Sequence, residues 1–247
     1  GGYYAKAWTR LLMGKALFDT DGERVDLPAG FTDAAVNLYG EYGITDYMTL
    51  VGFANPYGHA SYDEGDSASY VGFLGGGLRL GKPAGALNLA GEVRYGYAPD
   101  VGAEAVGAGV ADDVPFVLVP TVNTHRFEGE VQVGMGLPFG WWAASAGLRA
   151  FSEPSISPAV IGFAQLGWQA SDAWVLDLHL NLNQPVDEVE AVNVLGAGQT
   201  AYLGFGLSAS WWFFDQLGLH AGIEGVAYAQ SNASTPTFTL GLETRGR

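Results

Sequence analysis

Residues Trp174 to Asn183, WVLDLHLNLN, alternate between two chemically different rows. One row holds a tryptophan and four leucines, and the other is mostly polar, with Asp177 and His179 near its middle. A period of two residues is that of a β-strand, in which successive side chains point to opposite faces of the sheet. We therefore predict a strand whose one face meets an apolar medium, either a protein core or lipid, and whose other face meets water or polar groups.

The composition of the chain favours lipid as that medium. Only 15% of its 247 residues are charged, whereas ordinary soluble domains contain about 25%. This is too little charge to coat a normal soluble surface. No stretch approaches the ~20 consecutive apolar residues of a membrane helix, because glycine or a polar residue interrupts every run. Insertion into a membrane would therefore use strands.

The charge and the lack of cysteine exclude several classes of function. The net charge is −15, and four segments (19–30, 56–67, 99–121 and 186–198) hold fourteen acidic residues and one basic residue. Such a chain would repel the phosphates of nucleic acid, so we expect no nucleic-acid partner. Without cysteine, disulfides, thiol catalysis and cysteine metal sites are excluded. The first residues, GGYYAKAW, do not read as an export signal, which we expect to have been removed or to lie outside these residues.

Alternating runs recur along the whole chain, and we identify twelve strands and no helix. The strands are expected at residues 3–18, 31–43, 47–55, 68–80, 87–97, 127–137, 142–149, 160–169, 174–183, 202–211, 219–227 and from 238 to the end. Their regular spacing indicates antiparallel hairpins rather than β–α–β units. The sequence therefore predicts an all-β meander that forms a single domain over residues 1–247.

The connections between these strands alternate between short and mostly longer. Short turns are expected near 44–46, 82–85, 138–141, 171–173 and 213–216, and the longer loops are 19–30, 56–67, 99–121, 152–157, 186–198 and 230–235. The acidic residues concentrate in the longer loops. With twelve up-and-down strands, all short turns and both chain termini fall at one end, as in an outer-membrane barrel with periplasmic turns and extracellular loops.

Aromatic residues near the short turns predict a girdle at the membrane interface. The tryptophans expected in it are Trp141, Trp142, Trp168, Trp174, Trp211 and Trp212. The alternative is a soluble β-sandwich or closed barrel whose apolar rows face a protein core. Such a protein should have shorter strands and a charged outer face. Several rows here instead span the ~9–11 residues that a tilted membrane strand needs.

Over essentially its whole length, the chain resembles the bacterial outer-membrane β-barrel proteins. The segment YGITDYMTL at residues 42–50 is similar to the strand–turn segments of the barrel family linked to the meta-pathway of phenol degradation. The resemblance implies a transmembrane, antiparallel up-and-down β-barrel in a Gram-negative outer membrane, with outer-membrane lipid and lipopolysaccharide around it. The second family is thought to pass hydrophobic compounds. Outer-membrane barrels commonly end in an aromatic residue, whereas this chain ends at Arg247.

The inward rows predict which side chains line the lumen. They are Arg79, Glu92, Arg94, Arg126, Glu128, Glu130, Arg149, Asp177, His179, His220 and Glu224. Acids and bases are nearly balanced on these rows, so strong ion selectivity is not expected. Eight strands enclose a filled interior and sixteen an open channel, so twelve leave a narrow lumen. The charged side chains either line a pore or close it as a network of ion pairs.

Catalysis and metal binding have weaker support in the sequence. Asp177 and His179 share an inward row, and Ser208, Ser210 and His220 lie on nearby strands, but these residues form no recognisable hydrolytic motif. DTDGE at 19–23 and DEGD at 63–66 lack the full spacing of a calcium loop. We therefore predict no catalytic residue, no metal site and no cofactor.

The function that the sequence predicts is an outer-membrane channel or transporter. Small-molecule solutes, hydrophobic ones included, would pass through its narrow lumen. One alternative is a structural or anchoring barrel with a closed lumen and acidic loops that bind partners. The other alternative is a hydrolase embedded in the membrane.

Overall fold

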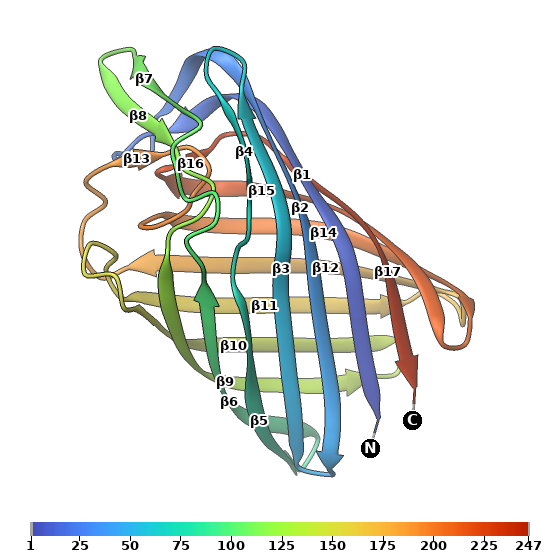
Figure 1. The fold of residues 1–247 in the computed structure, drawn as a ribbon. Helices are drawn as coiled ribbons and strands as arrows, with labels where there is room; N and C mark the ends of the chain where they lie inside the picture. The colour runs from blue at the N-terminus through green and yellow to red at the C-terminus, as the bar shows by residue number, and fades with distance from the viewer. Residues whose placement is uncertain (1, 247) are drawn as a thin grey trace.

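The alternating runs form a closed antiparallel barrel in the computed structural model, which describes residues 2–246 (Figure 1). Its wall consists of twelve strands: β1 (Tyr3–Phe18), β2 (Arg24–Thr45), β3 (Met48–Tyr62), β5 (Leu74–Ala84), β6 (Leu87–Ala98), β9 (Thr124–Leu137), β10 (Gly140–Phe151), β11 (Ala159–Gln169), β12 (Trp174–Pro185), β14 (Ala201–Phe214), β15 (Leu217–Gln230) and β17 (Thr237–Gly246). Each strand pairs with the next, and β17 pairs with β1 to close the cylinder. The predicted twelve-stranded up-and-down barrel is confirmed. No helix within residues 2–246 has the length and apolar character needed to cross a membrane.

The two ends of the barrel differ as the sequence predicts. β1 begins and β17 ends at the same end, where short connections also join β2 to β3 and β5 to β6 (Figure 1). We call it the turn end. The longer connections lie at the opposite end, which we call the loop end. Arg247, at the position where the sequence comparison with other barrels leads one to expect an aromatic residue, lies outside the described residues.

The apolar rows point outward. On β12, the side chains of Trp174, Leu176, Leu178, Leu180 and Leu182 are 37% to 47% exposed, whereas Asn183, on the opposite row, is buried. A soluble sandwich or barrel would enclose these leucines in a core, because apolar side chains stabilise a soluble fold only when they are removed from water. A belt of leucine, valine and aromatic side chains on the outside of a closed barrel instead matches the lipid-facing surface of a membrane barrel.

Two predicted loops, 19–30 and 56–67, are wrong in part, because β2 and β3 are longer than the sequence suggests and only residues 19–23 and 63–66 lie outside strands. Residues 24–30 belong to β2, and residues 56–62 belong to β3. Val25, Leu27 and Phe31 alternate with exposed residues and are at most 8% exposed, so this part of β2 has an apolar face of its own. Pro28 lies where the pairing of β1 with β2 is interrupted, and such an irregularity tolerates a residue without an N–H.

A small second sheet covers the loop end. It consists of β7 (Gly107–Ala111), β8 (Val114–Leu118) and β13 (Val192–Asn193), and the short strands β4 (Ser67–Tyr70) and β16 (Asn232–Ala233) add to the wall near it. We call β7, β8, β13 and the segments 119–123 and 194–200 the cap. Its apolar side packs on the extended strands of the wall, in a core that includes Leu17, Leu27, Phe31, Phe116, Leu118 and Val194. The predicted loop 99–121 therefore contains a β-hairpin, and the predicted strand 68–80 is divided between β4 and β5.

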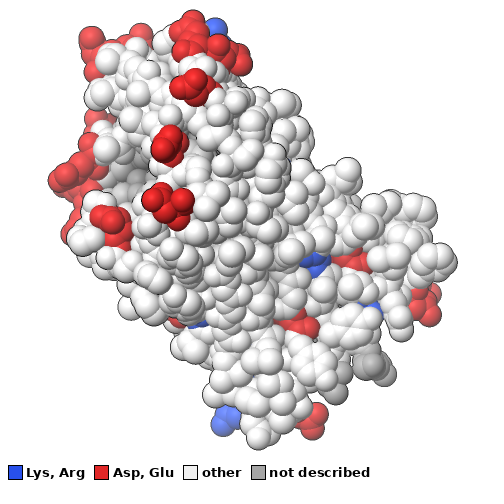
Figure 2. All heavy atoms as spheres, viewed as in Figure 1, with Lys and Arg blue, Asp and Glu red and all other residues white. Residues whose placement is uncertain are grey.

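The acidic residues gather at the loop end. Figure 2 shows clusters of aspartate and glutamate side chains there, whereas the surface next to them over the barrel wall holds few charged groups. The acids come mainly from the segments 19–30, 56–67, 99–121 and 186–198. The molecule therefore has a strongly negative end next to an uncharged belt.

Candidate functional site

Three cavities follow one another inside the barrel from the loop end to the turn end. We call the first, below the cap, the vestibule; it has a volume of about 400 Å³. The middle cavity is about 570 Å³ and the turn-end cavity about 460 Å³. The vestibule and the middle cavity share Tyr39, Arg149 and Tyr202 as lining residues, and the middle and turn-end cavities share Phe163 and Gln165. The cavities are therefore neighbours along a single lumen.

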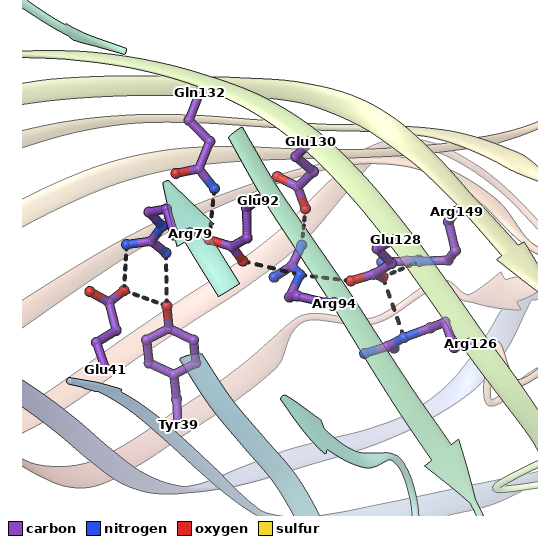
Figure 3. A network of polar contacts seen from close by, with 10 residues as sticks. All are labelled: Tyr39, Glu41, Arg79, Glu92, Arg94, Arg126, Glu128, Glu130, Gln132 and Arg149. Carbon is purple, nitrogen blue, oxygen red and sulfur yellow. Dashed lines mark hydrogen bonds and ion pairs between the residues drawn. The ribbon is translucent and has the colours of Figure 1, made fainter. Parts of the chain in front are cut away.

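One side of the lumen carries a network of ion pairs, which we call the charged wall (Figure 3). Its members are Glu41, Arg79, Glu92, Arg94, Arg126, Glu128, Glu130 and Arg149. They come from β2, β5, β6, β9 and β10. Four acids and four arginines balance in formal charge.

Arg79 forms the part of the charged wall nearest the turn end. Its Nη1 lies 3.0 Å from Glu41 Oε1, and its Nε lies 2.5 Å from Glu92 Oε2. Tyr39 donates its hydroxyl to Glu41, and Gln132 donates its amide to Glu92 over 3.1 Å. The side chain of Glu92 is 1% exposed, so its charge depends on these partners.

Glu128 lies at the centre of the part of the charged wall that is nearest the vestibule. Its carboxylate lies 2.9 Å from Arg94 Nε, 3.3 Å from Arg126 Nε and 2.6 Å from Arg149 Nε. Arg94 also pairs with Glu130. Three guanidinium groups thus surround one carboxylate whose side chain is 2% exposed.

The strand register explains these pairs. Arg79 lies directly opposite Glu92, and Glu128 lies between Arg94 on one neighbouring strand and Arg149 on the other. Directly opposite side chains on the same face of a sheet are in contact range. Once the barrel is closed, the charged wall follows from the alternation of each strand and its pairing.

The opposite side of the lumen holds His179 and His220, two of the four histidines of the chain. His179 Nδ1 lies 3.0 Å from Asp177 Oδ1, and its Nε2 lies 3.2 Å from Glu224 Oε1. Ser208 donates its hydroxyl to Asp177. His220 is buried, with Nδ1 3.4 Å from Ser210 Oγ. Because Ser208 bonds to the carboxylate and not to a histidine, the order of contacts differs from that of a Ser–His–Asp triad.

The eleven side chains predicted to line the lumen therefore lie in two groups inside the barrel. Seven belong to the charged wall, and Asp177, His179, His220 and Glu224 lie on the opposite side. Within residues 2–246, no group of three His, Asp or Glu side chains has the spacing of a metal site.

Two of the six tryptophans expected in the girdle point inward instead. Trp141 and Trp212 both line the turn-end cavity. Trp212 is 8% exposed and lies under the guanidinium of Arg245, whose central carbon is 3.9 Å from the ring centroid. The ring of Trp141 lies over Gly167, which has no side chain to oppose it. Neighbouring residues of a strand point to opposite faces, so a Trp–Trp pair can place only one ring in the girdle.

The other tryptophans lie on outward rows near the turn end. Trp168, Trp174 and Trp211 are 51%, 47% and 43% exposed, and Trp142 is half-buried. Trp174 and Trp211 lie opposite one another in the register and stack with their ring centroids 6.1 Å apart.

The aromatic lining of the vestibule was not predicted. Trp8, Phe53, Phe73 and Phe151 line this cavity together with Arg10. From the sequence, aromatic side chains near the short turns are expected at the membrane interface. For Trp8, a signal was present, because it lies on the same row as Lys6 and Arg10.

Asn193 fixes the cap over the vestibule. Its amide nitrogen donates to Val119 O over 3.0 Å and to Ala197 O over 2.7 Å, and its amide oxygen accepts the N–H of Val119 over 3.0 Å. Its own N–H donates to Ser231 Oγ over 2.9 Å. One buried side chain thus ties both segments of the cap to each other, and its backbone ties them to the barrel.

Comparisons with solved structures identify the fold. The sequence matches no protein-family model and no curated protein. An outer membrane channel from Pseudomonas putida F1 is similar in structure, with a TM-score of 0.69 and 15% identity over 100% of this chain and 96% of that one. The translocator domain of the autotransporter NalP from Neisseria meningitidis gives a TM-score of 0.59 and 15% identity, over 100% of this chain and 89% of that one.

The porin NanC gives a TM-score of 0.57 at 5% identity, over 97% of this chain and 98% of that one. At these identities, the likeness concerns the fold. Together with the outward apolar rows and the closed twelve-stranded wall, it shows that the chain has the fold of the outer-membrane β-barrels found in channels and porins.

Proposed function

We propose that the protein is a channel of the Gram-negative outer membrane that passes small solutes through its lumen. The observation that carries this proposal is the series of three neighbouring cavities inside a barrel with an apolar outer surface. In this proposal, the turn end faces the periplasm, and the loop end with its acidic segments faces the exterior. Outer-membrane lipid and lipopolysaccharide surround the belt.

The charged wall supports a passage rather than a filled interior. Its ion pairs form between neighbouring strands along the wall, because the register places the opposite charges side by side. The arginine side chains therefore extend along the wall, and the middle cavity stays open between Arg94 on one side and Asn181 on the other. The channel resemblance of the fold agrees with this arrangement.

A matched pair of tryptophan substitutions tests the proposal. Ser145 lines the middle cavity, whereas the next residue, Ala146, is exposed on the outward row. We expect Ser145→Trp to reduce both single-channel conductance in planar bilayers and the swelling of proteoliposomes in small sugars, because the indole fills part of the cavity. Ala146→Trp should leave both unchanged. Equal conductance and equal swelling rates for the two variants would contradict the channel. So would a folded wild-type barrel that passes neither ions nor sugars.

The second candidate is an anchoring barrel with a closed lumen. The cap over the vestibule and the acidic loop end favour it, because carboxylates can bind lipopolysaccharide phosphates through divalent cations. This function predicts that the folded barrel supports neither conductance nor swelling. It also predicts that removing divalent cations loosens the loop end in lipopolysaccharide membranes, which protease sensitivity would measure.

A further inference from the structure

The vestibule has a charge opposite to that of the molecule as a whole. The charged residues that line it are Arg10, Arg126 and Arg149, and no carboxylate among residues 2–246 lines it with them. The chain has a net charge of −15 and an acidic loop end directly outside this cavity. A solute that enters from the loop end therefore leaves a negative rim and meets guanidinium groups.

The carboxylates that balance these arginines lie behind them. The side chain of Arg10 is 38% exposed, whereas that of its partner Asp33 is 2% exposed. Arg126 and Arg149 are 19% and 22% exposed, and the carboxylate that they share, Glu128, is 2% exposed. The cavity is therefore in contact with the cations, and their counter-ions are screened from it by the arginine side chains.

Arg126 is the arginine with the weakest partner. Within the described residues, its ion pair is the contact of Nε with Glu128 over 3.3 Å. Glu128 also pairs with Arg94 and Arg149, at shorter distances. Figure 3 shows the end of its guanidinium group turned away from Glu128. Its central carbon lies 4.2 Å from the ring centroid of Phe73 and 5.1 Å from that of Phe53. These rings hold the guanidinium group in place and leave its terminal N–H groups without a carboxylate.

Aromatic rings form part of the vestibule's apolar lining, beside aliphatic side chains such as Ile156 and Leu195. Trp8, Phe53, Phe73 and Phe151 line the cavity, and the rings of Phe73 and Phe151 are 6.3 Å apart. Aromatic pairs at such distances prefer offset or edge-to-face contacts, which a further planar ring can join. A volume of about 400 Å³ is at the small end of ligand pockets, which suits a molecule of one or two rings.

We propose that the vestibule is a binding site for small aromatic carboxylates. The ring packs among Phe53, Phe73 and Phe151, and the carboxylate accepts hydrogen bonds from Arg126 and Arg149. Arginine is the side chain that binds carboxylates in a two-pronged geometry, and removal from bulk water strengthens such bonds. This inference rests on the proposed channel and names the solute class that it would select.

Isothermal titration calorimetry of the purified barrel in detergent tests the site with benzoate as the probe. Benzamide has the same shape without the charge, and acetate has the charge without the ring. We expect benzoate to bind at least about tenfold more tightly than either, because a charged hydrogen bond and ring burial each contribute more than a factor of ten. Equal binding of benzoate and benzamide, or no heat with benzoate, would overturn the proposal.

Substitutions locate the binding in the vestibule. Arg126→Gln should weaken benzoate binding about tenfold, and Arg24→Gln, at an exposed arginine of the loop end, should leave it unchanged. Phe73→Leu keeps the charge and should weaken benzoate but not acetate, so it tests the site even if Arg126→Gln does not fold. An unchanged benzoate affinity in Phe73→Leu, or in folded Arg126→Gln, would contradict the assignment.

The calorimetric result separates this inference from the proposed channel. Benzoate binding to a folded barrel that passes neither ions nor sugars would support the site and contradict the channel. Conductance without benzoate binding would support the channel and contradict the site.

Discussion

Glu128 is the residue on which the vestibule end of the charged wall depends. It is the one carboxylate that Arg94, Arg126 and Arg149 share, and its side chain is 2% exposed. If it loses its charge, three guanidinium groups face one another across a short distance. Removing one partner of a buried ion pair leaves an uncompensated charge, which costs more than the pair itself contributes.

We predict that Glu128→Gln lowers the free energy of unfolding by about 3 kcal/mol. The measurement is urea-induced unfolding of the barrel in lipid vesicles, followed by tryptophan fluorescence. Glu104→Gln, at an exposed residue of a loop, is the control and should have the stability of the wild type. Equal stability of the two variants would show that the guanidinium groups do not need this shared carboxylate.

Single residues also show where the sequence was sufficient for prediction. The charged side chains of the lumen could be predicted because successive side chains of a strand point to opposite faces. Glu92 and Arg94 are two residues apart and therefore point to the same face. Their partners could not be found, because Glu128 meets Arg149 only through the pairing of β9 with β10. The inward positions of Trp141 and Trp212 follow from the alternation of β10 and β14, and they contradict the girdle position expected from nearness to a short turn.

At the scale of the element, β12 shows how one strand serves two media. Leu178 is 46% exposed on the outer face, and Asn181 lines the middle cavity. An arginine in the middle of the outer face would have to enter the hydrocarbon, whereas an arginine on the inner face would meet water and polar groups.

We predict that Leu178→Arg destabilises the folded barrel in lipid vesicles by about 2–4 kcal/mol. Asn181→Arg, three residues further along the same strand, should change the stability by less than about 1 kcal/mol. Urea titration of both variants in the same vesicles gives the comparison. A smaller loss for the outward arginine than for the inward one would contradict the assigned facing of β12.

The first three strands show the opposite situation, in which local sequence was misleading. Asp19 to Gly30 has the glycine, proline and aspartate of a loop, yet residues from Arg24 onward belong to β2. Leu27 and Phe31 are buried by Phe116, Leu118 and other residues of the cap core. The strand is extended because a distant segment covers its apolar face, and no local pattern contains that information.

At the scale of the whole molecule, the charge is separated along the barrel axis. The acidic segments lie at the loop end, and the interior acids and arginines are nearly balanced. The field of the loop end therefore acts on solutes before they reach the vestibule. Its range depends on the ionic strength, from ~30 Å at 0.01 M salt to ~3 Å at 1 M.

We predict that neutralising Asp187, Glu188 and Glu190 to the corresponding amides lowers the permeability of cations relative to that of anions at about 0.01 M salt and has no effect on this ratio at about 1 M salt. Reversal potentials across planar bilayers under a salt gradient measure this ratio. A change of the same size at both ionic strengths would mean that these side chains contact the permeating ion directly.

The sequence alone determined the alternation of the strands, their number and the medium on each side of them. These features depend on a period of two residues and on whether each side chain is more stable in lipid or in water. The tertiary structure decided three further features. They are the cap, the extended strands β2 and β3, and a vestibule in which the arginine side chains cover their own counter-ions. They arise from contacts between segments far apart in the chain, such as Asn193 with Val119 and Arg149 with Asn183. Barrel closure brings these groups together, and only then do their hydrogen bonds and charges act on one another.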